Sequence, residues 1–338
     1  MKRVKRPSFR VVLIGLVVLY AVIIAVGLLI FRGYLQRYEQ NHPAGAMDAY
    51  FADLHSGKTE KILADSDFPF DAINTKDAYI DYLNERYRAG DGQWQYALKE
   101  ESDGRLVYDV YESNQKYGSL TLEKAEKGGY RVFSDWEFGA ETTFVSPVEP
   151  FVNGVSLSAY REGEPVTASE FEGLSGTLPT LSTYRVKTLL PPEVTLQNGV
   201  SPVLTTLKDG SVQVTAPVSA ADTATLTAFA EKAARTYACY ISNDAEYSEL
   251  QALLESNTPF TRWVRAYDRK WYNQHRSVEF QNMKVVSPVA WSEEYFTVDV
   301  SFDFVVSRTY DSSTFKTAYH IACRRSGDGF RVVNITPL

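Results

Sequence analysis

A length of 338 residues with 35 basic, 42 acidic and only two cysteine side chains places limits on this chain before any motif is considered. Five basic and no acidic residues fall in the first 31 positions, so the remainder holds 30 basic against 42 acidic residues, a net charge of −12. That balance excludes a typical nucleic-acid-binding protein, which needs clustered Lys and Arg, and the cysteine count excludes a disulfide-dense scaffold.

Residues 11–31 form a charge-free apolar segment near the start of the chain. As a helix, 21 residues span about 30 Å, the thickness of the hydrocarbon core of a membrane. The five basic residues precede this segment, which by the positive-inside rule leaves residues 1–10 as a cytoplasmic tail. No small-residue cleavage site of a signal peptide follows at Phe31-Arg32-Gly33. We therefore predict an uncleaved, single-pass anchor that contacts lipid through residues 11–31, with the rest of the chain extracytoplasmic at the cell membrane.

After a polar juncture at residues 32–43, residues 44–143 are predicted to form an α+β domain. An amphipathic helix is indicated by apolar residues at helical spacing from Met47 to Leu54. A short helix over residues 59–64 and a third helix capped by Asn74 or Thr75 follow. The spacing then changes to a period of two, which predicts strands over residues 93–99, 105–112, 117–123 and 130–138.

Residues 144–217 are rich in proline and contain no convincing helix. Alternating apolar residues predict a small all-β domain, whereas a structureless linker is the alternative. Strands are expected over residues 151–158, 184–189, 193–197 and 211–216. Asn153-Gly154 and Asn198-Gly199 are both dipeptides typical of tight β-hairpins.

Residues 218–338 repeat the order of the first domain. Three helices are expected: one from a cap at Asp222 to about Ile241, one that starts at Asn243, and one after the Thr258-Pro259 cap. Strands are predicted over residues 278–286, 295–307, 315–324 and 330–336, of which 295–307 alternates most regularly. The phrase Gly-Tyr-Arg-Val at residues 129–132 parallels Gly-Phe-Arg-Val at residues 329–332, which indicates a duplication.

These two helices-then-sheet units resemble the nuclear transport factor 2-like, or cystatin-like cone, superfamily. The complete layout, with its basic tail, membrane span and intervening β domain, resembles the teicoplanin-resistance-associated TcaA family of Gram-positive envelope proteins. The chain departs from that family because no cysteine-rich zinc ribbon precedes the anchor. The resemblance implies an α+β fold class with two cone domains that flank a small all-β domain, and an envelope-associated, non-enzymatic role.

Few residues stand out as carriers of chemistry. No His, Cys or carboxylate set has metal-ligand spacing, so neither a metal nor a cofactor is expected. Trp263, Tyr267 and Trp271 share one helical stripe that is suited either to core packing or to the floor of a ligand cavity. Cys239 and Cys323 are able to form a disulfide outside the cytoplasm, with two separate thiols as the alternative.

Two function classes follow from these observations. The first is a non-enzymatic binding or scaffold protein whose partner is a cell-wall component, a peptide or an envelope protein, with its functional surface in residues 221–338. The second is an isomerase or hydrolase that uses Asp299 or Asp303 as a general base in a cone cavity, which would require an apolar surrounding to raise the pKa of the carboxyl. A solvated sheet face is the plainer interpretation of those two carboxylates. The sequence alone does not identify a catalytic set.

Overall fold

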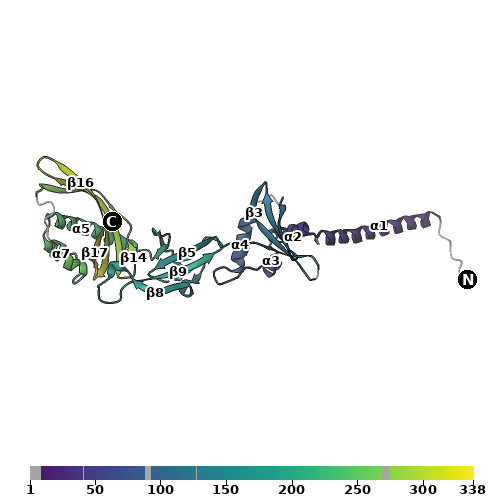
Figure 1. The fold of residues 1–338 in the computed structure, drawn as a ribbon, viewed down its shortest axis with the longest axis horizontal. Helices are drawn as coiled ribbons and strands as arrows, with labels where there is room; N and C mark the ends of the chain where they lie inside the picture. Colours follow the sequence, from purple (N-terminus) through teal and green to yellow (C-terminus); the bar gives the residue numbers. More distant parts are fainter. Residues whose placement is uncertain (1–8, 41, 88–92, 127, 268–273) are drawn as a thin grey trace. The chain divides into compact units, whose positions relative to one another are not determined.

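The computed structural model describes residues 9–40, 42–87, 93–126, 128–267 and 274–338. The chain separates into two compact units, one ending at Phe138 and one starting at Gly139 (Figure 1). Each unit contains helices packed on an antiparallel sheet, so the predicted mixed α+β class and the N-terminal apolar helix are both confirmed.

Helix α1 (Phe9–Gln40) contains the apolar segment. Its residues Leu16–Leu35 are long and apolar enough to cross a membrane, and none of that stretch is buried in the protein. In water, nothing covers the surface of an apolar helix that is exposed on all sides. The hydrocarbon core of a membrane is the environment that covers such a surface. By length and composition this helix is either a membrane anchor or a signal sequence.

In the first unit, α2 (Pro43–His55), α3 (Glu60–Asp65) and α4 (Lys76–Tyr87) precede a four-stranded antiparallel sheet in the order β1-β2-β3-β4. The strands are β1 (Gln95–Ser102), β2 (Arg105–Glu112), β3 (Gln115–Lys124) and β4 (Tyr130–Ser134). Thr75, one of the two expected caps, accepts a hydrogen bond from the Ala78 N–H at 3.2 Å. Asn74 is buried instead and hydrogen-bonds the Asp71 carboxylate.

Arg86 ties α4 to the sheet of the first unit. Its guanidinium donates to the Tyr117 and Asp135 carbonyl oxygens, both at 2.8 Å, and forms an ion pair with the Asp135 carboxylate at 3.1 Å. Gly118 lies directly beneath, because a Cβ there would come within 2.7 Å of the Arg86 Nε and the Tyr87 hydroxyl. The period-3.6 pattern predicted the helix, while this polar clamp comes from contacts between distant segments.

Residues 139–217, here named the β module, contain two sheets. The larger has the order β11-β12-β5-β9-β8, and the smaller has the order β10-β6-β7. The strands are β5 (Ala140–Ser146), β6 (Phe151–Val152), β7 (Val155–Ser156), β8 (Arg161–Thr167), β9 (Thr180–Thr188), β10 (Val194–Thr195), β11 (Val203–Thr206) and β12 (Val212–Thr215), with short 3₁₀ turns η1 (Leu157–Tyr160), η2 (Ser169–Phe171) and η3 (Gln197–Gly199). The expected boundary after residue 143 is wrong, because β5 pairs along its whole length with β9 of the β module.

The two Asn-Gly dipeptides of the β module behave differently. Asn153 and Gly154 have positive φ angles of 51° and 78° and connect β6 to β7 as a hairpin, as predicted. The hairpin expected at residues 198–199 is wrong. The turn η3 links β10 to β11, and these strands belong to different sheets.

Residues 218–338, here named the second α+β domain, begin with α5 (Ala220–Ser242), α6 (Tyr247–Gln251) and α7 (Pro259–Ala266). Ser219, rather than Asp222, caps α5 and accepts the Asp222 N–H at 3.1 Å. Asn243 ends α5 in the left-handed conformation, so α6 starts after Glu246 and not at Asn243. Thr258 caps α7 as predicted, with its hydroxyl accepting the Thr261 N–H at 2.9 Å.

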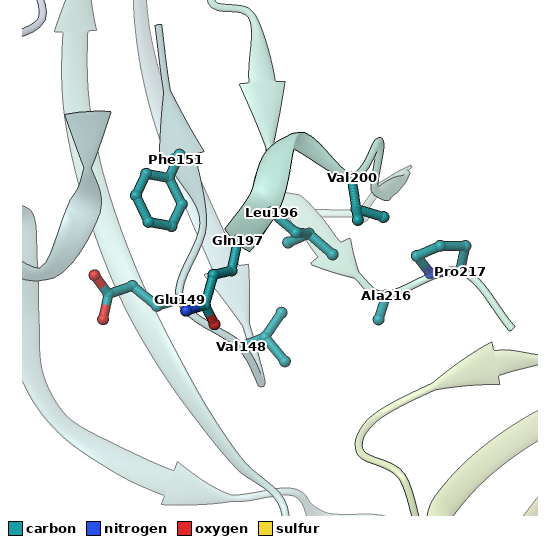
Figure 2. A pocket seen from close by; sticks show the side chains of 8 residues that line it. All are labelled: Val148, Glu149, Phe151, Leu196, Gln197, Val200, Ala216 and Pro217. Carbon is teal, nitrogen blue, oxygen red and sulfur yellow. The ribbon is translucent and has the colours of Figure 1, made fainter. Parts of the chain in front are cut away.

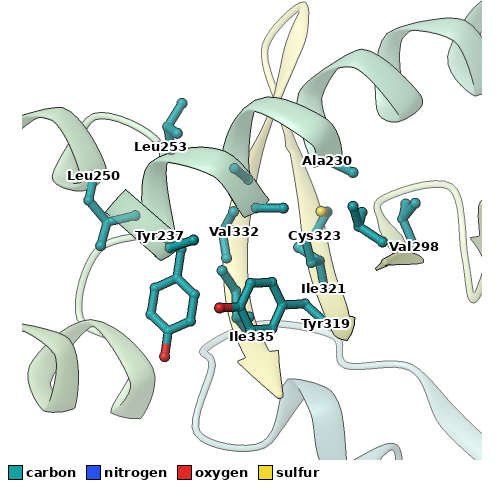
Figure 3. Close-up of a cluster of buried hydrophobic side chains, with 14 of the residues drawn as sticks. Ala230, Tyr237, Leu250, Leu253, Val298, Tyr319, Ile321, Cys323, Val332 and Ile335 are labelled. Atoms are coloured by element: carbon teal, nitrogen blue, oxygen red, sulfur yellow. The ribbon is translucent and has the colours of Figure 1, made fainter. Parts of the chain in front are cut away.

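The sheet of this domain runs β13-β15-β16-β17, with β14 paired to β15. Its strands are β13 (Ser277–Val285), β14 (Val289–Ala290), β15 (Tyr295–Ser307), β16 (Ser312–Ser326) and β17 (Gly329–Pro337). The alternation of β15 has its expected effect, since Val298, Val300 and Phe302 face α5 in the core. Figure 3 shows this core filled by side chains from α5, α6 and three strands, including Tyr237, Leu250, Tyr319, Ile321, Cys323 and Val332.

The β module packs directly on the second α+β domain. Phe171 of η2 is fully buried, with its ring 4.9 Å from the ring of Tyr295 and 6.0 Å from that of Trp291. Ala322 and Val333 complete this apolar contact. Burial of one large aromatic ring between two sheets joins the module to the domain.

Candidate functional site

A groove of about 500 Å³ opens on the β module. Its walls are mainly apolar, with two polar side chains, and Figure 2 shows the eight residues that line it: Val148, Glu149, Phe151, Leu196, Gln197, Val200, Ala216 and Pro217. Phe151 and Glu149 lie across the groove from Val200 and Ala216. An apolar concave surface with a few polar groups is the usual form of a binding site.

Local backbone geometry holds the walls of the groove. The Leu196 N–H donates to the Val200 carbonyl at 2.8 Å, and the Gly199 N–H donates to the Leu196 carbonyl at 3.1 Å, which closes the turn that carries Gln197. On the opposite wall, the Ser156 hydroxyl donates to the Glu149 carboxylate. This contact fixes the only carboxylate among the lining residues, so the groove combines an apolar floor with one negative group at its side.

Asp299 and Asp303 lie on the outer face of the second sheet, opposite to the face that packs on α5. The Asp299 carboxylate contacts the His320 Nδ1 at 2.6 Å and is 40% exposed. This hydrogen bond raises the pKa of His320, while burial opposes the rise and the Asp299 and Glu170 charges add to it. Asp303 accepts a hydrogen bond from the Asn282 amide at 2.7 Å.

A second, more polar groove of about 550 Å³ runs over this outer face. Asp303 lines it with Asn282, Lys284, Ser301 and Lys316. The wall of this groove is open and lined by charged side chains, whereas the predicted catalytic site required an enclosed apolar cavity. The geometry thus places both aspartates on a solvated face rather than in a cone cavity.

Two members of the predicted aromatic set lie side by side. The Trp263 and Tyr267 rings lie 5.2 Å apart, and Trp263 is 50% exposed. Tyr267 is the residue that follows α7, so the helix ends there and does not continue as one stripe. Trp271 lies outside the described residues. The use of Trp263 and Tyr267 as a ligand surface stays a prediction.

The two cysteines are free thiols. Cys323 is buried in the core beneath α5, and Cys239 is half-buried on α5 itself. Burial raises the pKa of Cys323 to about 12 and that of Cys239 to about 11. Both thiols are therefore protonated and unreactive at neutral pH. The expected alternative of two separate thiols describes the structure, and the disulfide does not form in it.

The groove of the β module was missed by reasoning from the sequence. Its lining comes from three separate segments, residues 148–151, 196–200 and 216–217, and the strands predicted there do not show that the segments meet. The signal that was available was the cluster of proline and Asn-Gly turns, which marks tight changes of direction but not the surface that they enclose.

No protein-family model and no curated protein matches the sequence. Among solved structures, this chain is similar to a protein described as an "Ntf2 like protein involved in plasmid conjugation". The match covers 84% of this chain and 97% of that protein's chain. The sequence identity is 12% and the TM-score is 0.27.

Proposed function

We propose that the chain is a single-pass membrane protein that presents binding surfaces outside the cytoplasm, as a non-enzymatic scaffold of the bacterial cell envelope. The observation that carries this proposal is α1, which is apolar and exposed and lies between a basic segment and two folded units. Retention of α1 as an uncleaved anchor with residues 1–10 in the cytoplasm is part of the proposal.

Two further features support a scaffold over an enzyme. The core of the second α+β domain is filled by side chains, and the carboxylates considered for catalysis lie on the opposite, open face of its sheet. The order of three helices and four main strands after α1 in the first unit recurs in the second α+β domain, with the β module between them in the chain, and supports two nuclear transport factor 2-like domains and a TcaA-like relationship. The partner classes we propose are a cell-wall component, a peptide or another envelope protein.

Crosslinking in intact envelopes tests the scaffold role. The wild-type chain should give one dominant crosslinked product, and Val200→Lys, which places a charge in the groove, should remove that product. Val166→Lys is the matched control, because Val166 is 67% exposed on β8 and does not line the groove. A wild-type chain without a reproducible product, or a product that survives Val200→Lys unchanged, would count against the proposal.

The second candidate, an isomerase or hydrolase that uses Asp299 or Asp303, has one observation in its favour, namely the position of Asp303 in the outer groove. The scaffold proposal expects no turnover of ester, peptide or ketone substrates that depends on these carboxylates. An activity of the purified wild-type chain that is abolished by Asp299→Asn or Asp303→Asn would establish the enzyme instead.

A further inference from the structure

Strand β11 (Val203–Thr206) forms an open edge of the larger sheet in the β module. It pairs with β12 on one side, and all four of its residues are exposed. In an antiparallel pair, every second residue of an edge strand directs its N–H and C=O groups away from its neighbour. These main-chain groups are the natural partners of another extended strand.

The composition of β11 sets it apart from the other edge strands of four or more residues in the described part of the chain; the two-residue edge strands β7 and β10 also lack charge and proline. At the far edge of the same sheet, β8 carries Arg161, Glu162, Glu164 and Pro165. Edge strands β1 and β13 contain charged residues, such as Glu100 in β1 and Lys284 in β13. Charges and proline on an edge prevent unwanted strand pairing, whereas Val-Leu-Thr-Thr in β11 has neither.

Strand β11 begins close to the groove and carries two exposed apolar side chains. Val203 is 39% exposed and Leu204 is 51% exposed. Val203 pairs with Thr215, the residue before the groove-lining Ala216, and Val200 lines the groove three positions before β11 begins. A strand added to β11 would therefore extend toward the groove, which is able to accept one of its apolar side chains.

Charge indicates the kind of strand that fits. Glu149 supplies the only charge in the groove lining, and the chain after residue 31 has a net charge of −12. A basic peptide is attracted to such a surface, and an acidic peptide is repelled. The peptide that fits has three features. Its main chain pairs with the edge of β11, an apolar side chain enters the groove, and a positive side chain meets Glu149.

We infer that β11 and the adjoining groove bind an extended, net-basic peptide segment of a partner protein by β-strand addition. This inference rests on the proposed binding function and names the class of its partner. The peptide's main chain pairs with the free edge of β11, one apolar side chain enters the groove beside Phe151 and Leu196, and a Lys or Arg meets the Glu149 carboxylate.

Selection from a random library of phage-displayed peptides, each of about seven residues, tests the inference on the purified full chain in detergent. Enriched peptides should alternate apolar and polar residues, carry net positive charge and lack a central proline. Leu204→Lys should weaken binding of the enriched peptide by about tenfold or more, because it puts a charge on the edge. Val166→Lys, a charge on the already protected edge of β8, should leave binding unchanged.

Two synthetic forms of the enriched peptide separate main-chain pairing from simple apolar contact. One form has its odd-numbered amides N-methylated and the other has its even-numbered amides N-methylated. Only one of the two forms should lose binding, because only one set of N–H groups faces β11. Equal binding by both forms, selection of acidic peptides, or equal affinity of the wild type and Leu204→Lys would overturn the inference. The inference would also be overturned if the wild-type chain formed a concentration-dependent dimer that Leu204→Lys, and not Val166→Lys, converted to monomer. That result would show that β11 pairs with a second copy of this chain. This selection uses purified protein, and the crosslinking experiment uses intact envelopes. A failed selection therefore overturns the inferred peptide binding without contradicting the proposed scaffold function.

Discussion

At the residue scale, the contact between His320 and Asp299 is the clearest local source of pH dependence. The two residues are cross-strand neighbours on β15 and β16, and the side chains meet at 2.6 Å. The hydrogen bond that His320 donates to the Asp299 carboxylate raises the pKa of His320 above its ordinary value, which is about 6.5. The folded protein then holds the His320 proton more tightly than the unfolded chain does.

The sign of the effect follows from this shift. The stabilisation is fully present below pH of about 6.5, and it is lost as the pH rises through the higher folded-state pKa of His320. The free energies of unfolding of wild type and Asp299→Asn should be measured in urea, from below pH about 6.5 to above the folded-state pKa of His320. The two values should converge as the pH rises. Parallel curves for the two proteins would contradict the prediction.

At the element scale, the start of α5 depends on Ser219. Its hydroxyl accepts the Asp222 N–H at 3.1 Å, and the Asp222 carboxylate in turn accepts a hydrogen bond from Arg325 at 3.0 Å. We expect Ser219→Ala to lower the free energy of unfolding by about 1 kcal/mol, because an N–H at the helix start loses its partner.

Thr225→Ala provides the matched control for the cap. Thr225 is exposed in the second turn of α5, and its hydroxyl returns to the Ala221 carbonyl, which is already part of the helix. Since alanine has the higher helix propensity, this variant should be neutral or slightly stabilising. Urea unfolding of both variants makes the comparison. Similar losses in both would show that the Ser219 cap has no special role.

The same helix shows why element boundaries resisted prediction. Ser219 and Asp222 both have side chains suited to capping, and in the fold Ser219 caps the helix while the Asp222 carboxylate bonds Arg325. Asn243 favours both a helix start and a left-handed helix end, and the chain uses the second. By contrast, the bounds of β15 were predicted at both ends, since its alternation continues unbroken over the whole strand.

The β module was harder to predict because its signals are weak or shared. Strand β8 contains a proline and three charged residues, and β11 is short and exposed on every residue, so neither has an alternating pattern. The candidate binding surface combines β11 with groove residues from distant turns, so it becomes visible only when the chain is folded.

At the scale of the whole molecule, Phe171 connects the β module to the second α+β domain. Its ring has no exposure and lies against Trp291 and Tyr295. Phe171→Ala should lower the free energy of unfolding by about 3–5 kcal/mol where the β module and the second α+β domain unfold together, because it leaves a cavity at their contact. The Trp291 fluorescence and near-ultraviolet circular dichroism should change at the same time. Val166→Ala, at an exposed position, should change neither. An unaltered unfolding midpoint in Phe171→Ala would contradict this role.

The most direct measurement is thiol labelling of intact cells with a membrane-impermeant maleimide. Tyr310→Cys offers a reporter in the turn between β15 and β16, since Tyr310 is 97% exposed, and Lys2→Cys offers one in the basic segment before α1. The native thiols add little background, because burial raises the pKa of Cys239 to about 11 and that of Cys323 to about 12. The anchored topology predicts that Tyr310→Cys reacts in intact cells and that Lys2→Cys reacts only after permeabilisation. The reverse pattern, or a chain released from the membrane that has lost residue 2 through cleavage after α1, would contradict it.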